Sequence, residues 1–174
     1  DAFHVNGIIA GNLLESLRSG EYEALIHFSS SEVYGTAQRV PMSETHPLLP
    51  HTPYAAGKAA ADHLVHSYAE SFGVRALTIR PFNNFGPRQN EGMYAGVIPI
   101  TMTRILRGEP PVVQGSGLQT RDFIFVRDTA RLALLLGKRE DLYGRILNVG
   151  SGQEVSVGSL VASIAKIAGY TGPI

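Results

Sequence analysis

Short apolar runs alternate with longer helical patterns along most of this 174-residue chain. Residues 24–28 are almost continuously apolar, and residues 74–79 are rich in β-branched side chains. Such runs are typical of strands that are buried on both faces of a sheet. Further short strands are predicted at 112–113, 123–126 and 146–149. Because helical segments separate the strands, the sequence predicts an α/β fold with a mostly parallel sheet.

The helices are predicted from apolar spacing and from capping residues. Thr52 precedes Pro53 as an N-cap precedes a proline at the first helical position, and Gly73 ends the same helix. The predicted helices span residues 6–17, 53–72, 97–106, 128–136 and 157–168. The polar stretch between 29 and 51 predicts a long loop, and such loops are more often functional than idle. Residues 80–96 are predicted to be irregular.

Composition excludes several classes of protein. Acidic and basic residues are equal in number, 15 of each, and this balance argues against a nucleic-acid partner. The chain has no cysteine and therefore neither disulfides nor thiolate metal sites. Its six histidines lack metal-ligand spacing, so no metal is expected. We see no apolar run that could span a bilayer, so we expect no membrane association and a cytoplasmic location.

Tyr54 and Lys58 form the first chemical signal. A spacing of four residues places both side chains on one face of the predicted helix. A phenol is a poor base at neutral pH, because its unperturbed pKa is about 10. A nearby ammonium favours the phenolate, so Lys58 is expected to lower the pKa of Tyr54 and allow proton exchange with a substrate hydroxyl. Alone, this spacing is common and is weak evidence of an active site.

Three serines, Ser29, Ser30 and Ser31, strengthen this interpretation. They follow the predicted strand at 24–28, and α/β sheets bind their ligands at the carboxyl ends of strands. A serine hydroxyl there could bond the same substrate oxygen that Tyr54 deprotonates. The alternative, a capped strand end in a serine-rich turn, explains the serines but not their pairing with Tyr54 and Lys58.

Four motifs now occur in order at natural intervals. They are Ser-Ser-Ser-Glu-Val-Tyr-Gly at 29–35, Pro-Tyr-Ala-Ala-Gly-Lys at 53–58, Arg-Pro-Phe-Asn-Asn-Phe-Gly-Pro-Arg at 80–88 and Thr-Arg-Asp-Phe-Ile-Phe-Val at 120–126. Over essentially its whole length the chain resembles the NAD-dependent epimerase/dehydratase family of extended short-chain dehydrogenases. The resemblance implies a Rossmann-like doubly wound parallel sheet and part of a small C-terminal substrate-binding region. It also implies NAD as cofactor and a nucleotide-diphosphate sugar as substrate.

The resemblance assigns a role to each matching residue. Tyr54 is the catalytic acid/base, Lys58 lowers its pKa and holds the nicotinamide ribose, and Ser30 orients the sugar 4-hydroxyl. The other cofactor-binding residues that it implies are Ser29, Pro81, Phe82 and, on a looser match, Asn6. The other substrate-binding residues that it implies are Asn83, Val97, Gln114, Arg121 and Arg88. Among these, Arg121 would meet the diphosphate, a role suited to a guanidinium fork. Arg88 is equally well explained as a loop cap, and Asp122 and Asp128 as acids that structure a loop or a helix start.

The reaction stays open between several outcomes of one chemistry. Family members oxidise the sugar C4 hydroxyl to a 4-keto intermediate, and then epimerise it, remove water across C5–C6 or decarboxylate it. Glu32 matches a glutamate that some dehydratases and the decarboxylases carry, although an acid that only bonds the loop explains it equally well. Ser31 stands where thymidine-diphosphate-type dehydratases have an aspartic acid. We therefore expect an epimerase or a 4,6-dehydratase, with a UDP-glucuronate-type decarboxylase as the alternative. A non-catalytic sensor or scaffold of the same fold is disfavoured, because Ser30, Tyr54 and Lys58 are all present.

The glycine-rich loop that cradles the NAD pyrophosphate in this family does not occur in the sequence. In the family it belongs to N-terminal βαβ units that precede the first helix of this chain. We therefore expect a fragment: residues 1–90 as the C-terminal half of the Rossmann core with the catalytic residues, and residues 91–174 as mainly substrate-binding region with returning core elements. The isolated fragment is expected to bind NAD poorly and to be inactive. The intact protein is expected to form a homodimer through the helices at 6–17 and 53–72.

Overall fold

The computed structural model describes residues 2–90, 92 and 95–174, which form two compact units. Unit 1 comprises Asp1–Phe82 and Arg127–Gly150, and unit 2 comprises Asn83–Val126 and Ser151–Ile174. The polypeptide therefore passes from unit 1 to unit 2, returns to unit 1 and ends in unit 2.

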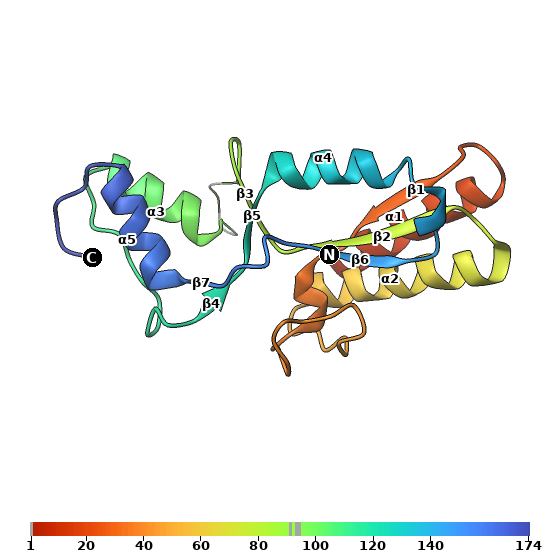
Figure 1. Cartoon of the computed structure of the whole chain (residues 1–174), viewed down its shortest axis with the longest axis horizontal. Coiled ribbons are helices and arrows are strands. Elements are labelled where there is room, and N and C mark those ends of the chain that lie inside the picture. Colours follow the sequence, from red (N-terminus) through yellow and green to blue (C-terminus); the bar gives the residue numbers. More distant parts are fainter. Residues whose placement is uncertain (1, 91, 93–94) are drawn as a thin grey trace. The chain divides into compact units, whose positions relative to one another are not determined.

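Unit 1 is built on a parallel sheet of three strands in the order β1-β2-β6. These strands are β1 (Leu25–Phe28), β2 (Ala76–Pro81) and β6 (Ile146–Val149). Helices α1 (Ala2–Arg18) and α2 (Pro53–Phe72) lie on one face of the sheet, and α4 (Val126–Leu136) lies on the other (Figure 1). Two short 3-10 turns, η1 (Ser31–Tyr34) and η2 (Glu140–Leu142), complete this unit.

The core between the sheet and the helix pair explains this arrangement. Leu14 and Leu17 of α1 pack against Val65 of α2 and Ala76 of β2, and all four side chains are buried. Each leucine buried in this way contributes about 1.5–3 kcal/mol relative to an exposed one. This packing holds α2, the helix that carries Tyr54 and Lys58, firmly against the sheet.

Both ends of α2 form as the sequence predicts. Thr52 Oγ1 accepts a hydrogen bond from the backbone N–H of Ala55 at 3.1 Å, and Pro53 occupies the first turn. Gly73 closes the helix in the left-handed conformation, with φ of 63°. The predicted helix at 53–72 is therefore confirmed to the residue.

The described residues of unit 2 form two small sheets and two helices. Strands β3 (Asn83–Phe85) and β5 (Phe123–Phe125) pair in parallel, whereas β4 (Thr120–Arg121) and β7 (Val155–Ser156) pair antiparallel. Helices α3 (Val97–Leu106) and α5 (Val157–Ile167) pack against each other. None of the helices in the described part of the chain is both long and apolar enough to cross a membrane.

The structure confirms the α/β class and the parallel sheet and corrects several local predictions. Residues 83–85, predicted to be irregular, form β3. Residues 112–113 form no strand, and the two prolines before them lack the N–H groups that a ladder needs. Arg80 and Pro81, predicted to be irregular, belong to β2 and pair with Asn148 and Val149 of β6. A charged residue followed by a proline gives no local sign of a strand, and here tertiary contacts decide the outcome.

Candidate active site

The serine turn begins directly after β1. Ser30 has extended backbone angles and caps η1, and its Oγ accepts a hydrogen bond from the N–H of Glu32 at 3.2 Å. Gly35 closes this turn with φ of 68°, and a Cβ at that position would overlap the carbonyl oxygen of Leu49. The turn therefore holds the Ser30 hydroxyl at the carboxyl end of a parallel strand, where the sequence predicted it.

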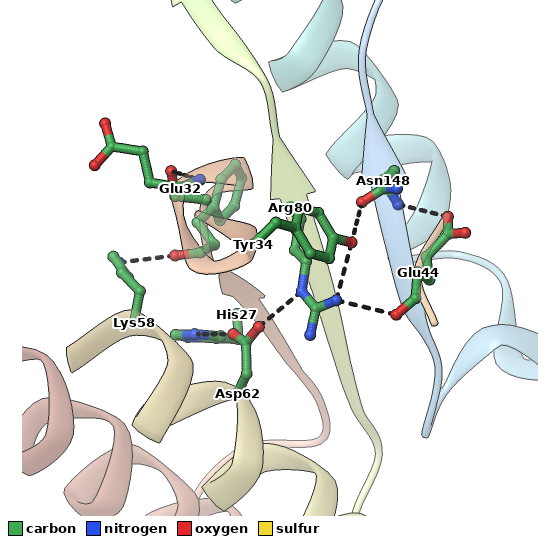
Figure 2. A network of polar contacts seen from close by, with 10 residues as sticks. His27, Glu32, Tyr34, Glu44, Lys58, Asp62, Arg80 and Asn148 are labelled. Atoms are coloured by element: carbon green, nitrogen blue, oxygen red, sulfur yellow. Dashed lines mark hydrogen bonds and ion pairs between the residues drawn. The ribbon is translucent and has the colours of Figure 1, made fainter. Parts of the chain in front are cut away.

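Tyr54 and Lys58 occupy the first two turns of α2. Tyr54 is 40% exposed, which leaves its phenol accessible. The Lys58 ammonium donates a hydrogen bond to the carbonyl oxygen of Phe28 at 2.8 Å, at the last residue of β1 (Figure 2). This bond ties α2 to the strand that leads into the serine turn. Ser30, Glu32, Tyr54 and Lys58 thus all lie in unit 1.

The electrostatics of Tyr54 differ from the sequence-based expectation. Burial raises the pKa of the Tyr54 phenol, the charge of Glu32 raises it further, and a side-chain hydrogen bond with Ser30 opposes them. The net direction is upward, so the predicted lowering by Lys58 does not hold in this structure. Lys58 instead bonds the Phe28 carbonyl. The influence of Glu32 and Ser30 on this pKa also shows that both lie near the phenol.

Lys58 is subject to two opposing effects. Burial lowers the pKa of its ammonium, because the charged form loses hydration, and the negative charge of Asp62 raises it in part. Asp62 lies one helical turn after Lys58 on α2 and is almost completely buried, with a side chain 1% exposed. Asp62 thus helps to keep Lys58 charged.

The sequence did not reveal a set of polar residues behind the site, namely the buried Tyr34, Asp62 and Arg80 and the partly buried Asn148. Burial raises the pKa of the Asp62 carboxyl, but His27 and Arg80 beside it outweigh burial and hold that pKa below its usual range. One signal was available in the sequence. Asp62 and Arg80 each fall among apolar neighbours at core-facing positions, and opposite charges that are both buried must pair.

The other predicted cofactor residues of unit 1 lie at its strand ends and on α1. Pro81 is buried at the end of β2, and the N–H of Phe82 donates to the carbonyl of Val149 at 2.8 Å. Asn6 lies on α1 and is partly buried, and Ser29 is buried directly after β1. Their assignment to the cofactor stays a prediction.

Unit 2 carries the residues predicted to bind the nucleotide sugar. Asn83 is partly buried and donates through Nδ2 to the carbonyl of Asp122 at 3.0 Å, and Val97 begins α3. Arg121 is exposed and donates to the carbonyl of its neighbour Thr120 at 2.8 Å. The remaining two, Gln114 and Arg88, are also exposed.

Asp122 has the loop-structuring role that the sequence favoured. Its carboxylate accepts hydrogen bonds from the backbone N–H groups of Ser151 and Gly152, both at 2.8 Å, and from the Ser151 hydroxyl at 2.7 Å. It therefore fixes the turn after β6 rather than offering a free carboxylate. No group of three or more His, Asp or Glu side chains within residues 2–90, 92 and 95–174 could hold a metal ion.

The geometry defines an α/β protein with a tyrosine, a lysine and a serine gathered at the carboxyl end of a parallel strand. Residues 1–150 match the model of the NAD dependent epimerase/dehydratase family. The chain belongs to this family, whose cofactor is NAD.

Individual relatives carry out more than one reaction. The chain is 35% identical over 166 residues to the UDP-glucose 4-epimerase of Mycolicibacterium smegmatis, covering 95% of this chain and 53% of the relative. A solved UDP-N-acetylglucosamine 4-epimerase from Methanobrevibacter ruminantium M1, in complex with UDP-N-acetylmuramic acid, superposes with a TM-score of 0.89 at 36% identity, over 94% of this chain and 53% of that one.

A solved dTDP-glucose 4,6-dehydratase from Bacillus anthracis, in complex with NAD, superposes with a TM-score of 0.88 at 29% identity. That match covers 97% of this chain and 53% of the dehydratase. This chain therefore spans about half the length of the relatives that it matches.

The side chains of unit 1 fit the sugar-bearing end of such a cofactor. An ammonium carries three N–H donors, and one of those of Lys58 is used on the Phe28 carbonyl. The half-exposed Tyr54 hydroxyl lies on the same helix, one turn earlier. Hydroxyl and ammonium donors at the carboxyl ends of parallel strands match the place where open α/β sheets bind nucleotide ligands.

Proposed function

We propose that this chain carries the proton-transfer half of the active site of an NAD-dependent enzyme that acts on nucleotide sugars, as a 4-epimerase or a 4,6-dehydratase. The observation that carries the proposal is the grouping of Tyr54, Ser30 and Glu32. The Ser30 hydroxyl and the Glu32 charge both act on the pKa of the Tyr54 phenol. Ser30 and Glu32 lie where β1 leads into η1. A phenol and a hydroxyl are thus available to one substrate oxygen.

In this mechanism the substrate is held by hydrogen bonds before any proton moves. Ser30 Oγ accepts from the Glu32 N–H, and its own O–H, which bonds the Tyr54 phenol here, would donate to the sugar 4-oxygen when substrate binds. Tyr54 then accepts the proton of that hydroxyl as the C4–H bond breaks. NAD, when bound, supplies the acceptor for the hydride. Lys58 and the residues Ser29, Asn6, Pro81 and Phe82 would hold the cofactor.

The 4-keto sugar that results decides which product is formed. Rotation of the sugar followed by return of the hydride to the opposite face gives the 4-epimer. Removal of the C5 proton and loss of the C6 hydroxyl, followed by return of the hydride to C6 and of a proton to C5, would give the dehydrated product. Glu32 is exposed and lies close enough to Tyr54 to raise its pKa, which supports a role for this carboxylate beside the sugar. Asn83, Val97, Gln114, Arg121 and Arg88 would contact the nucleotide and its diphosphate.

Mass spectrometry of products tests this proposal. The intact protein that contains this chain is incubated with NAD and a panel of UDP- and dTDP-sugars. We expect a product of unchanged mass for epimerisation or of the substrate mass minus water for dehydration. Loss of carbon dioxide from a uronic acid sugar would instead make it a decarboxylase. Binding of a sugar nucleotide without any turnover would contradict the proposal and favour a sensor.

We also propose that the intact protein forms a homodimer through α1 and α2. The support is an exposed apolar stripe along α1, formed by Val5, Ile8, Ile9 and Leu13, each more than 40% exposed. A contiguous apolar surface of this kind is typical of an interaction site. Light scattering of the intact protein should give twice the protomer mass, and Ile8→Glu should reduce it to the protomer mass.

A further inference from the structure

One buried guanidinium lies behind the candidate active site. The side chain of Arg80, on β2, is 2% exposed, and its Nε donates to Asp62 Oδ2 on α2 at 2.8 Å. A buried ion pair gains little net stability over apolar packing of the same shape, because both charges lose their hydration. The position of this pair therefore calls for an explanation beyond stability.

The same guanidinium also reaches the loop side of the site. Its Nη1 donates to the Tyr34 hydroxyl at 2.9 Å and to the carbonyl of Glu44 at 3.2 Å. The Tyr34 hydroxyl in turn donates to Asn148 Oδ1 on β6 at 2.6 Å, and the N–H of Asn148 donates to the Glu44 carboxylate at 2.8 Å. Figure 2 shows Arg80 at the centre of these contacts, between α2, η1 and β6.

The contacts of Arg80 with Asp62 and with Tyr34 reach the two elements that carry the candidate active-site residues. Asp62 follows Lys58 by one turn of α2, as Lys58 follows Tyr54. Tyr34 is the last residue of η1, the turn that Ser30 caps and that contains Glu32. Tyr34 and Val33 pack against Ala59 of α2 and are fully buried. The chain of contacts Asp62–Arg80–Tyr34 therefore joins the helix of the proposed base to the turn of the proposed hydroxyl donor.

We propose that Arg80, Asp62 and Tyr34 are positioning residues, which set the separation between the Ser30 hydroxyl and the Tyr54 phenol by clamping η1 to α2. This inference rests on the proposed function, and its effect on catalysis is indirect. None of the three side chains is accessible enough to contact the sugar, because each is at most 2% exposed. A hydroxyl and a phenol that share one substrate oxygen tolerate little displacement, and an error of about 1 Å can lower a rate about 100-fold.

A matched pair of variants tests the inference. Tyr34→Phe removes one hydroxyl and keeps the ring, which Arg80 covers with its guanidinium carbon 4.9 Å from the ring centroid. Tyr143→Phe is the control. Its hydroxyl donates to the carbonyl of Gly137 at 2.9 Å, and Arg75 covers its ring at 4.9 Å, but it lies outside the clamp. Tyr34→Phe thus loses two hydrogen bonds and Tyr143→Phe loses one, each in unit 1 beneath one cation–π contact.

Steady-state kinetics of the intact protein give the first measurement. We expect Tyr34→Phe to lower kcat by about 10- to 100-fold with KM within about twofold, because positioning acts on the chemical step. Tyr143→Phe should keep both constants within about twofold of the unsubstituted protein. An equal fall of kcat in both variants, or an unchanged kcat in Tyr34→Phe, would overturn the inference.

Amide hydrogen exchange gives a measurement that needs no activity. The N–H groups of Glu32, Val33 and Gly35 are hydrogen-bonded within η1, to Ser30 Oγ, Ser30 O and Glu32 O. In Tyr34→Phe these amides should exchange at least about 10-fold faster, because η1 has lost its tie to Arg80, whereas in Tyr143→Phe they should not change. Unchanged exchange in Tyr34→Phe would overturn the clamp. If the unsubstituted protein turns over no nucleotide sugar, the proposed function fails, and the exchange result alone decides the inference.

Discussion

The two units hold their candidate functional side chains in different ways. In unit 1, Lys58, Asp62 and Arg80 are wholly or largely buried, and their hydrogen bonds reach other elements of the fold. In unit 2, Arg121 is exposed, and its hydrogen bond goes to the neighbouring backbone. The difference teaches that the groups proposed for proton transfer are held in place by the fold, whereas Arg121, proposed for the nucleotide sugar, is held only by its own neighbour in the chain.

The largest expected effect is the loss of the buried carboxylate of unit 1. Asp62→Ala leaves the Arg80 guanidinium buried without its partner, and we expect the free energy of unfolding to fall by about 3–5 kcal/mol. Urea denaturation measures this loss, with the exposed Arg121→Ala as the control, expected within about 0.5 kcal/mol of the unsubstituted protein. Equal stability of the two variants would remove the distinction between the units.

Titration of the Asp62 carboxylate should make the stability of the protein depend on pH. Because the pKa of Asp62 is lower in the folded than in the unfolded chain, its stabilisation is present above the unfolded pKa of about 3.9. It is lost as the pH falls through the lower folded value. Urea denaturation across acidic pH should therefore show a loss that Asp62→Asn, which has no charge to titrate, does not show.

A second effect is expected in binding rather than in stability. Arg121→Ala should weaken binding of the nucleotide sugar about 10- to 100-fold, because a hydrogen bond to a charged group contributes about 1.5–3 kcal/mol. Arg121→Lys keeps the charge but loses the planar fork, so its affinity should lie between those of Arg121→Ala and the unsubstituted protein. Calorimetric titration of the intact protein measures these constants. An unchanged Kd in Arg121→Ala would remove this arginine from the site.

A smaller effect concerns the helix caps of the two units. Thr52 caps α2, and Ser156 caps α5 through a bond from the N–H of Ser159 at 3.2 Å. Replacing either by alanine should lower the free energy of unfolding by about 1 kcal/mol. Only Thr52→Ala should also lower kcat, since Thr52 lies two residues before Tyr54. An equal fall of kcat in Ser156→Ala would contradict this separation.

The smallest expected effect is a shift along the pH axis. Because the Glu32 charge raises the pKa of Tyr54, Glu32→Gln should lower that pKa. Oxidation requires the deprotonated phenol, so the rise of kcat with pH should move to lower pH in this variant. The control is Glu109→Gln, at an exposed ion pair with Arg104 in unit 2, which should leave the profile unchanged. A shift to higher pH would contradict the geometry around Tyr54.

The sequence predicted the fold well wherever signals were local. Caps at Thr52 and Gly73 bounded α2, and apolar runs located the three strands of the parallel sheet. The sequence also placed Ser30 at a strand end and Tyr54 and Lys58 on one helix. It could not predict that Lys58 would bond the Phe28 carbonyl, because that bond depends on how α2 packs against β1.

The contacts Asp62–Arg80–Tyr34 could not be predicted from the sequence for a related reason. Arg80, Asp62 and Tyr34 are separated by 18 to 46 positions, and no spacing rule connects them. The upward pKa of Tyr54 was likewise unpredictable, since it arises from burial and from Glu32, which a different element contributes. Long-range contacts thus decide both what supports the site and how its groups titrate.

Substitution of Tyr54 tests the central claim most directly. In the intact protein with NAD and a nucleotide sugar that it converts, Tyr54→Phe should lower turnover by at least about 100-fold, because general acid–base catalysis contributes about 10²- to 10⁴-fold. Sugar-nucleotide binding should stay within about threefold, because the lost hydroxyl acts mainly in the transition state. Tyr68→Phe, on the same helix and bonded to Glu15, is the control and should retain full turnover. Retention of full turnover by Tyr54→Phe would contradict the account.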